Sequence, residues 1–332
     1  MKNKSCQTGM TFIEIMIALL MGSILLGGVL QVFLGSKQTF KMQQALSRLQ
    51  ENGRFALDFL AKDIRMAGFL GCNSSITSID INLPNRFDRA FKYVLSGDES
   101  ITKSWISNAC GNNGECIRGT DAITFYSANS CGGLLSNNAS SKLYLNSDTC
   151  RILAKDIVLI SNCVNVNIFR PTQVSSIDKI KSIEYISNNK IFPIDSYVPK
   201  EAEVFSVNAY TYFIRTGTGI SKQPSLWRLN NAKAIIPSDN PVEFIEGIEN
   251  MQIAYGVDSG SVKTPNYYAP ANQVSNWSKV VSVQISLLAV SLDDNLTSQP
   301  VPYTFNNILT TPTDRRIRRV FNTTIALRNR LL

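Results

Sequence analysis

The chain has 332 residues, of which 44% are hydrophobic and 17% charged, and its formal net charge is +8. It contains no histidine, which excludes Ser-His-Asp and Cys-His catalysis and any zinc site with a histidine ligand. The sequence also lacks a phosphate-binding loop, a G-x-S-x-G elbow and a convergent carboxylate motif. We therefore expect no enzyme, no cofactor and no metal site.

A short polar leader with two lysines ends at Gly9, and an apolar run follows over residues 12–34. As a helix this run would be about 35 Å long, enough to cross the hydrocarbon core of a bilayer. The lysines favour a cytoplasmic amino terminus. Residues 34–37 fit a secretory cleavage site poorly. The alternatives are a simple uncleaved anchor and cleavage before the run, between Gly9 and Met10.

Glu14 is the one charged residue of the apolar run. A carboxylate at the centre of a bilayer costs about 2.5–3.5 kcal/mol, and less near the interface. We therefore expect Glu14 to have a function that offsets this cost.

Residues 36–67 contain no proline and are rich in good helix formers. Apolar residues recur there at spacings of three, four or seven, which predicts one stripe of an amphipathic helix. The stripe consists of Met42, Leu46, Leu49, Ala56, Leu60, Ile64 and Ala67. Gly53 occupies a gap in it and would allow close packing, and Gly68 and Gly71 are stop signals. We predict one long helix over residues 10–67, transmembrane in 12–34.

Residues 68–332 lose the helical periodicity and contain β-prone runs between polar turns. The predicted strands cover residues 122–126, 156–160, 164–169, 204–214, 225–229, 244–255, 280–290 and 320–327. We interpret residues 129–141 as a loop and 76–107 as an insertion. A long helix followed by many strands predicts an α+β fold with an antiparallel sheet packed on the helix. The head is either one large domain or two stacked subdomains.

Cysteine usage is typical of an exported head. Cys6 lies in the leader, and six cysteines remain after it: Cys72, Cys110, Cys116, Cys131, Cys150 and Cys163. An even set predicts up to three disulfides in an oxidising periplasm, but the sequence does not choose the pairing. Cys110 and Cys116 could close a small loop. The alternative, a thiolate metal site, lacks any C-x-x-C pair.

Arginines concentrate near the carboxyl end, at Arg315, Arg316, Arg318, Arg319, Arg328 and Arg330. Such a run could contact DNA or anionic lipid. A solvated strand face or a subunit contact is the commoner role of such a run. We favour that role and do not expect nucleic acid as a partner.

Residues 9–16, GMTFIEIM, resemble the class III signal of type IV pilins and type II secretion pseudopilins. The resemblance implies that prepilin peptidase cuts after Gly9 and methylates the new amine of Met10, where the family usually has phenylalanine. It also implies that Glu14 meets the charged amine of a neighbouring subunit in the membrane. Opposite charges attract strongly at low dielectric constant, and either charge alone is penalised there.

Later segments are similar to PilW-type minor pilins. They are residues 50–56, 63–69, 119–123, 156–163, 225–228, 242–251, 255–258 and 316–330. Each has a plain structural interpretation as core, turn or solvated surface. Together they imply a filament component of the type IV pilus, with roles in adhesion and twitching motility.

The resemblance implies a single helix in the bacterial inner membrane, a periplasmic head, and later a place at the extracellular pilus tip. The implied partners are prepilin peptidase, the assembly platform, the major pilin and other minor pilins, with a large tip adhesin as a further candidate. The nearest alternative is a type II secretion minor pseudopilin, whose leader chemistry is the same. An alternative of another class is a membrane-tethered periplasmic enzyme or binding protein.

Overall fold

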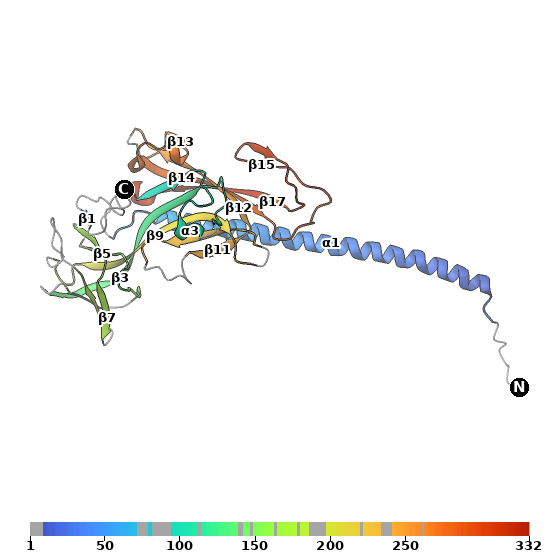
Figure 1. Cartoon of the computed structure of the whole chain (residues 1–332), viewed down its shortest axis with the longest axis horizontal. Helices are drawn as coiled ribbons and strands as arrows, with labels where there is room; N and C mark the ends of the chain where they lie inside the picture. The colour runs from blue at the N-terminus through green and yellow to red at the C-terminus, as the bar shows by residue number, and fades with distance from the viewer. Residues whose placement is uncertain are drawn as a thin grey trace.

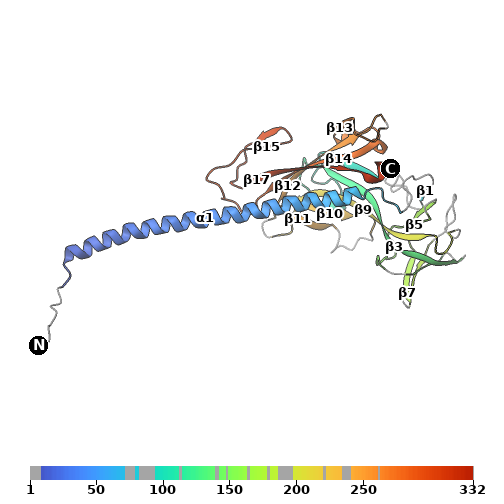
Figure 2. The same ribbon diagram turned by 180° about the vertical axis from the view of Figure 1, so that it is seen from behind.

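The structure is a computed structural model that describes residues 9–71, 79–81, 94–111, 114–138, 142–146, 149–162, 165–177, 180–185, 197–219, 222–233, 241–260 and 262–331. Figure 1 shows one long helix that carries a β-rich head on its carboxyl-terminal half. The start of this helix lies at the end that is far from the head. The view from behind shows that the helix curves gently along its length (Figure 2).

The helix α1 spans Phe12–Arg65 and is continuous over 54 residues. It therefore begins two residues later and ends two residues earlier than predicted. Gly68 follows its end with a left-handed φ of +78°, which favours glycine. The Gly68 N–H donates to the Tyr126 carbonyl at 2.8 Å, which fastens the end of the helix to the sheet.

Only the second half of α1 is buried. Its buried residues are Ala45, Leu49, Gly53, Ala56, Leu60, Ala61 and Ile64. The predicted stripe is thus confirmed from Leu49 onward and is wrong at Met42, whose side chain is 41% exposed. The stripe fails there because the head buries helix side chains only from about Ala45, so Met42 lies outside the core.

The described strands form a large sheet, a four-stranded sheet and a hairpin. The large sheet contains β1 (Ile79–Ile81), β2 (Leu95–Asp98), β3 (Ala122–Asn138), β4 (Lys142–Leu145), β5 (Val158–Ser161), β6 (Val166–Phe169), β7 (Gln173–Ile177), β8 (Ile180–Glu184), β9 (Glu203–Thr216), β10 (Pro224–Asn230) and β11 (Val242–Glu246). Its main path runs β1-β6-β5-β9-β3-β4-β8-β7; β2 pairs with β3, and β10 lies between β9 and β11.

The four-stranded sheet has the order β13 (Tyr267–Ala269), β12 (Ile248–Val257), β14 (Val280–Val290) and β17 (Arg318–Ala326). All its pairs are antiparallel. The hairpin consists of β15 (Tyr303–Phe305) and β16 (Ile308–Thr310). Short helices complete the described chain: α3 (Ser107–Cys110), η2 (Ala271–Gln273), η3 (Trp277–Lys279) and α4 (Arg328–Leu331). The long helix and the antiparallel sheets confirm the predicted α+β fold.

Each of the eight predicted strand runs overlaps an observed strand. Two other predictions are wrong in part. Residues 129–138 do not form a loop, because β3 continues to Asn138 through a bulge between Ser130 and Gly132 and pairs with β9 and then β4; residues 139–141 lie outside the described part. The segment 76–107 contains β1 and β2, and its residues 76–78 and 82–93 lie outside the described part.

The helix and the sheet approach each other closely at Gly53. A methyl group at this position would sit 2.4 Å from the ring of Phe321 on β17, well inside van der Waals contact. Leu60 and Ile64 on the same face are fully buried in the core that α1 shares with β12, β14 and β17. Glycine therefore lets the helix approach the sheet, as its position in the stripe predicted.

We expect Gly53→Ala to destabilise the head. Overpacking costs about 1–3 kcal/mol, more than the roughly 1 kcal/mol by which alanine improves a helix over glycine. Chemical denaturation of the detergent-solubilised chain, followed by tryptophan fluorescence, measures the change. Gly35→Ala is the control, because a methyl group there meets no atom within 4 Å. Equal midpoints for the two variants would contradict the packing argument, and a Phe321→Leu background should reduce the Gly53→Ala penalty.

Candidate assembly surface

The first half of α1 presents a continuous apolar surface that no other described part of the chain covers (Figures 1 and 2). Large side chains from Phe12, which is 77% exposed, to Leu34 are all open. Among the described residues, α1 is the one helix long and apolar enough to cross a membrane. Such a surface requires lipid or other apolar helices around it.

Glu14 lies in the first turn of α1, just after the proposed processing site. Its backbone N–H donates to the Thr11 carbonyl at 3.1 Å. The carboxylate therefore stands at the positive end of the helix dipole, which stabilises negative charge. Gly9 and Met10 precede the helix and are exposed. Within the described residues Glu14 has no ion-pair partner, so its countercharge would have to come from elsewhere.

A polar and aromatic cluster fixes the end of α1 to the head. The hydroxyl of Tyr212 donates to Asp63 at 2.7 Å, and the Arg228 guanidinium lies 3.5 Å from the same carboxylate. Arg228 also stacks 4.6 Å from the ring centres of Tyr210 and Phe244. Burial, and after it the negative charge of Asp63, raises the pKa of Tyr212, which keeps its hydroxyl a donor.

This cluster joins three of the segments on which the resemblance to PilW rested. Asp63 lies in residues 63–69, Arg228 in 225–228 and Phe244 in 242–251. Phe59 on α1 packs edge-on against Phe244 with ring centres 4.9 Å apart. No pattern in the sequence indicates that these residues meet, because Asp63 and Tyr212 are separated by 149 positions.

Further hydrogen bonds run along the helix. Gln38 donates to the carbonyls of Asn295 and Leu296, both at 3.1 Å. Asn52 donates to the Glu246 carbonyl at 3.1 Å. At the far end, Asn329 donates to the Ala67 carbonyl at 3.0 Å. The head is thus attached to α1 from Gln38 to its end, and the exposed apolar half begins where these contacts stop.

Two disulfides lie in the described part of the head. Cys110 pairs with Cys116 and closes the small loop considered from the sequence. Cys131 on β3 pairs with Cys150, which precedes β5. Cys72 and Cys163, and the leader cysteine Cys6, lie outside the described residues.

The carboxyl-terminal arginines do not form one solvated face. The Arg318 side chain is only 6% exposed and pairs with Asp314 at 2.6 Å and Glu249 at 2.7 Å. Hydrogen bonding to Arg318 lowers the pKa of the Asp314 carboxyl, although burial raises it. Arg316 donates to Gln223. These two arginines are therefore structural, whereas Arg319 and Arg328 are exposed.

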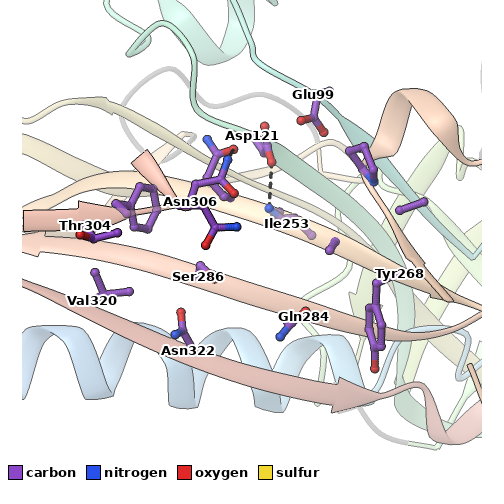
Figure 3. Close-up of a pocket in the computed structure, with 16 residues that line it drawn as sticks. Glu99, Asp121, Ile253, Tyr268, Gln284, Ser286, Thr304, Asn306, Val320 and Asn322 are labelled. Carbon is purple, nitrogen blue, oxygen red and sulfur yellow. Dashed lines mark hydrogen bonds between the residues drawn. The ribbon is translucent and has the colours of Figure 1, made fainter. Parts of the chain in front are cut away.

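A polar pocket of about 590 Å³ lies on the face of the four-stranded sheet away from α1 (Figure 3). Gln284, Ser286 and Asn322 rise from its floor. Asp121, which immediately precedes β3, accepts from the backbone N–H groups of Ser100 at 2.9 Å and Ile253 at 2.8 Å. Asp121 thereby ties the large sheet to the four-stranded sheet. Within the described part of the chain, no group of three or more potential metal ligands converges.

One apolar amino-terminal helix that continues into a β-rich head fits the membrane-anchored pilins as a class. Two family profiles match this chain. The Prokaryotic N-terminal methylation motif matches residues 4–30, and the Type IV Pilus-assembly protein W family matches residues 211–329. The two matches confirm the resemblance to PilW-type pilins and support a minor pilin of the type IV pilus. Comparison with curated proteins and with solved structures gave no significant match.

The PilW match covers the part of the head that holds the helix. It begins within β9 and includes Tyr212, Arg228 and Phe244 of the polar and aromatic cluster at the end of α1. It also includes the four-stranded sheet that packs on α1. The portion before it contains most of the remaining large sheet and both described disulfides. The family signature thus coincides with the attachment of head to helix.

We expect the effect of Asp121→Asn to depend on pH. Burial raises the pKa of the Asp121 carboxyl to about 6, against the lowering effect of the Ser100 and Ile253 N–H groups; nearby Glu99 raises it further. The folded protein then binds this proton more tightly than the unfolded chain, whose pKa is near 3.8. The contribution to stability is full below about pH 4 and is lost as the pH rises through 6.

The difference in the free energy of unfolding between the wild type and Asp121→Asn should therefore fall by up to about 3 kcal/mol between pH 4 and pH 7. Asparagine itself leaves one backbone N–H without an acceptor, a cost of about 1–3 kcal/mol that does not vary with pH. Urea denaturation of both proteins at several pH values measures the difference. A difference that is constant from pH 4 to pH 7 would contradict the assignment.

Proposed function

We propose that this protein is a minor pilin that helps to initiate type IV pilus assembly and sits in the tip complex with other minor pilins. The observation that carries the proposal is the apolar half of α1, which no other described part of the chain covers and whose carboxylate at the start has no ion-pair partner among the described residues. Packing among the helices of other subunits would cover this surface, and an amine would neutralise the carboxylate. The PilW match favours a pilus over a secretion system.

Maturation would divide the chain into a leader over residues 1–9, the helix over 10–67 and the periplasmic head over 68–332. Prepilin peptidase would cut after Gly9 and methylate Met10. The exposed position of both residues ahead of the helix supports this step, since a peptidase needs an accessible backbone. The match to the methylation motif supports it independently.

Glu14 would recruit the next subunit. In the membrane its carboxylate would meet the methylated amine of a neighbouring chain, and both groups would lose the penalty of isolated charge. The interaction would also set the register between neighbouring helices, because each helix has one carboxylate that can make it.

The head accounts for the place at the tip. The head packs along the carboxyl-terminal half of α1 (Figure 1), and heads of this size would crowd a repeating shaft. A tip position would leave the head room, in contact with other minor pilins and the first major pilin. The protein would reach the tip after its release from the assembly platform in the inner membrane. A large adhesin is a further candidate partner at the tip.

Replacement of Gly9 by valine should block leader removal, because the peptidase requires a small residue before the cut. Intact mass spectrometry of the membrane fraction would then show the unprocessed chain without methylation at Met10. Gly22→Val is the control, since this glycine also has open space around it but lies within α1. Normal processing of Gly9→Val would show that the cleavage site is elsewhere.

Deletion of the gene should reduce the number of surface pili and the rate of twitching. The wild-type gene should restore both, whereas Glu14→Gln should restore them poorly, since loss of one partner of a desolvated charge pair costs about 3–5 kcal/mol. Glu51→Gln is a matched control because Glu51 is an exposed carboxylate on the same helix outside the apolar run. A normal pilus count in the deletion strain would reject the proposed function.

A further inference from the structure

The free edge of β17 and the basic groove beside it form, we propose, a docking site for an acidic, extended peptide segment. The segment would add to the four-stranded sheet as a fifth strand. The inference rests on the geometry of the head and does not depend on a role at the pilus tip.

The register of β17 shows which backbone groups are free. Leu327 N–H donates to Val281 O and Ser291 N–H to Ile317 O, each at 2.9 Å, so the odd-numbered residues of β17 bond to β14. In an antiparallel ladder the alternate residues point their backbone groups the other way. Val320, Asn322 and Thr324 therefore direct N–H and C=O groups to the open edge, where they have no partner among the described residues.

A groove of about 530 Å³ runs between this edge and α1. Asn322 and Thr323 line it on the strand side. Leu57 and Ala61 of α1 give it an apolar base, and Met66, which is half exposed, lies at its end. An added strand would thus have an apolar surface beneath alternate side chains, as strand addition requires.

The rim of the groove is strongly basic. It carries Arg54, Lys62, Arg65 and Arg328, against one carboxylate, Asp58. None of the four cations has an ion-pair partner within the described chain. Charges of this kind favour an acidic partner and reject a basic one.

The free backbone groups at the edge of β17 favour an acidic peptide over another polyanion. Alternating donors and acceptors match the backbone of a second strand, whereas a nucleic acid would use only the cations. A nine-residue edge strand is also a hazard for unwanted pairing, and proteins usually protect such an edge. An acidic segment would both cover this edge and form ion pairs with the basic side chains of the rim.

The test uses the full-length protein in detergent micelles and a fluorescent ten-residue peptide of alternating glutamate and valine. We expect saturable binding in fluorescence anisotropy. Asn322→Pro should weaken it at least tenfold, because proline removes an edge N–H that β14 does not use. Asn322→Ala keeps that N–H and should bind as the wild type does. Circular dichroism and the melting temperature would verify that both variants are folded.

A second pair of variants tests the charge. Lys62→Gln with Arg65→Gln should weaken binding at least tenfold, whereas Lys41→Gln with Arg48→Gln, on the same helix outside the groove, should not. A peptide N-methylated on alternate residues keeps its charge and should fail to bind. No binding, equal binding of the N-methylated peptide, or equal binding of a poly-dT oligonucleotide would each overturn the proposal.

Discussion

The burial of one side of α1 beneath the four-stranded sheet fixes the position of every other part of the molecule. Glycine at position 53 brings the helix axis close enough for the Phe321 ring to cover it. The same face carries Leu60 and Ile64 into the core. Because the helix is continuous, this packing also determines where its apolar half emerges from the head. The position of the exposed apolar surface is therefore set by contacts in the second half of α1.

The two halves of α1 answer to different physical demands. The first half is apolar around its circumference, which suits lipid and helix neighbours. The second half is apolar on one stripe, and its exposed side is charged. The cluster of Asp63, Tyr212 and Arg228 lies near the end of the second half, where a hydrogen bond and an ion pair add direction to apolar packing. Packing holds the helix on the sheet, and this cluster fixes its rotation and register.

Local patterns predicted the helix well because its periodicity is repeated many times. They also located the strands, since runs such as residues 280–290 are rich in β-branched side chains. The pattern misplaced Met42, because the sequence does not state where the head stops covering the helix. It missed the continuation of β3 past Asn129, since polar side chains there form a strand only by pairing with β9 and β4. The polar and aromatic cluster at the end of α1 and the free edge of β17 arise only when distant segments come together in the folded chain. A single sequence carries no signal for them.

The direction in which α1 meets the head has a mechanical consequence. The helix is about 80 Å long, and its contacts with the head are spread in line from Gln38 to Ala67. A pull along its axis would load these contacts together, in shear, and not one after another as in peeling. The hydrogen bonds at the two ends of this attached stretch and the packed apolar stripe between them would share the force. A head joined in this way is suited to remain attached to α1 when the helix is under tension.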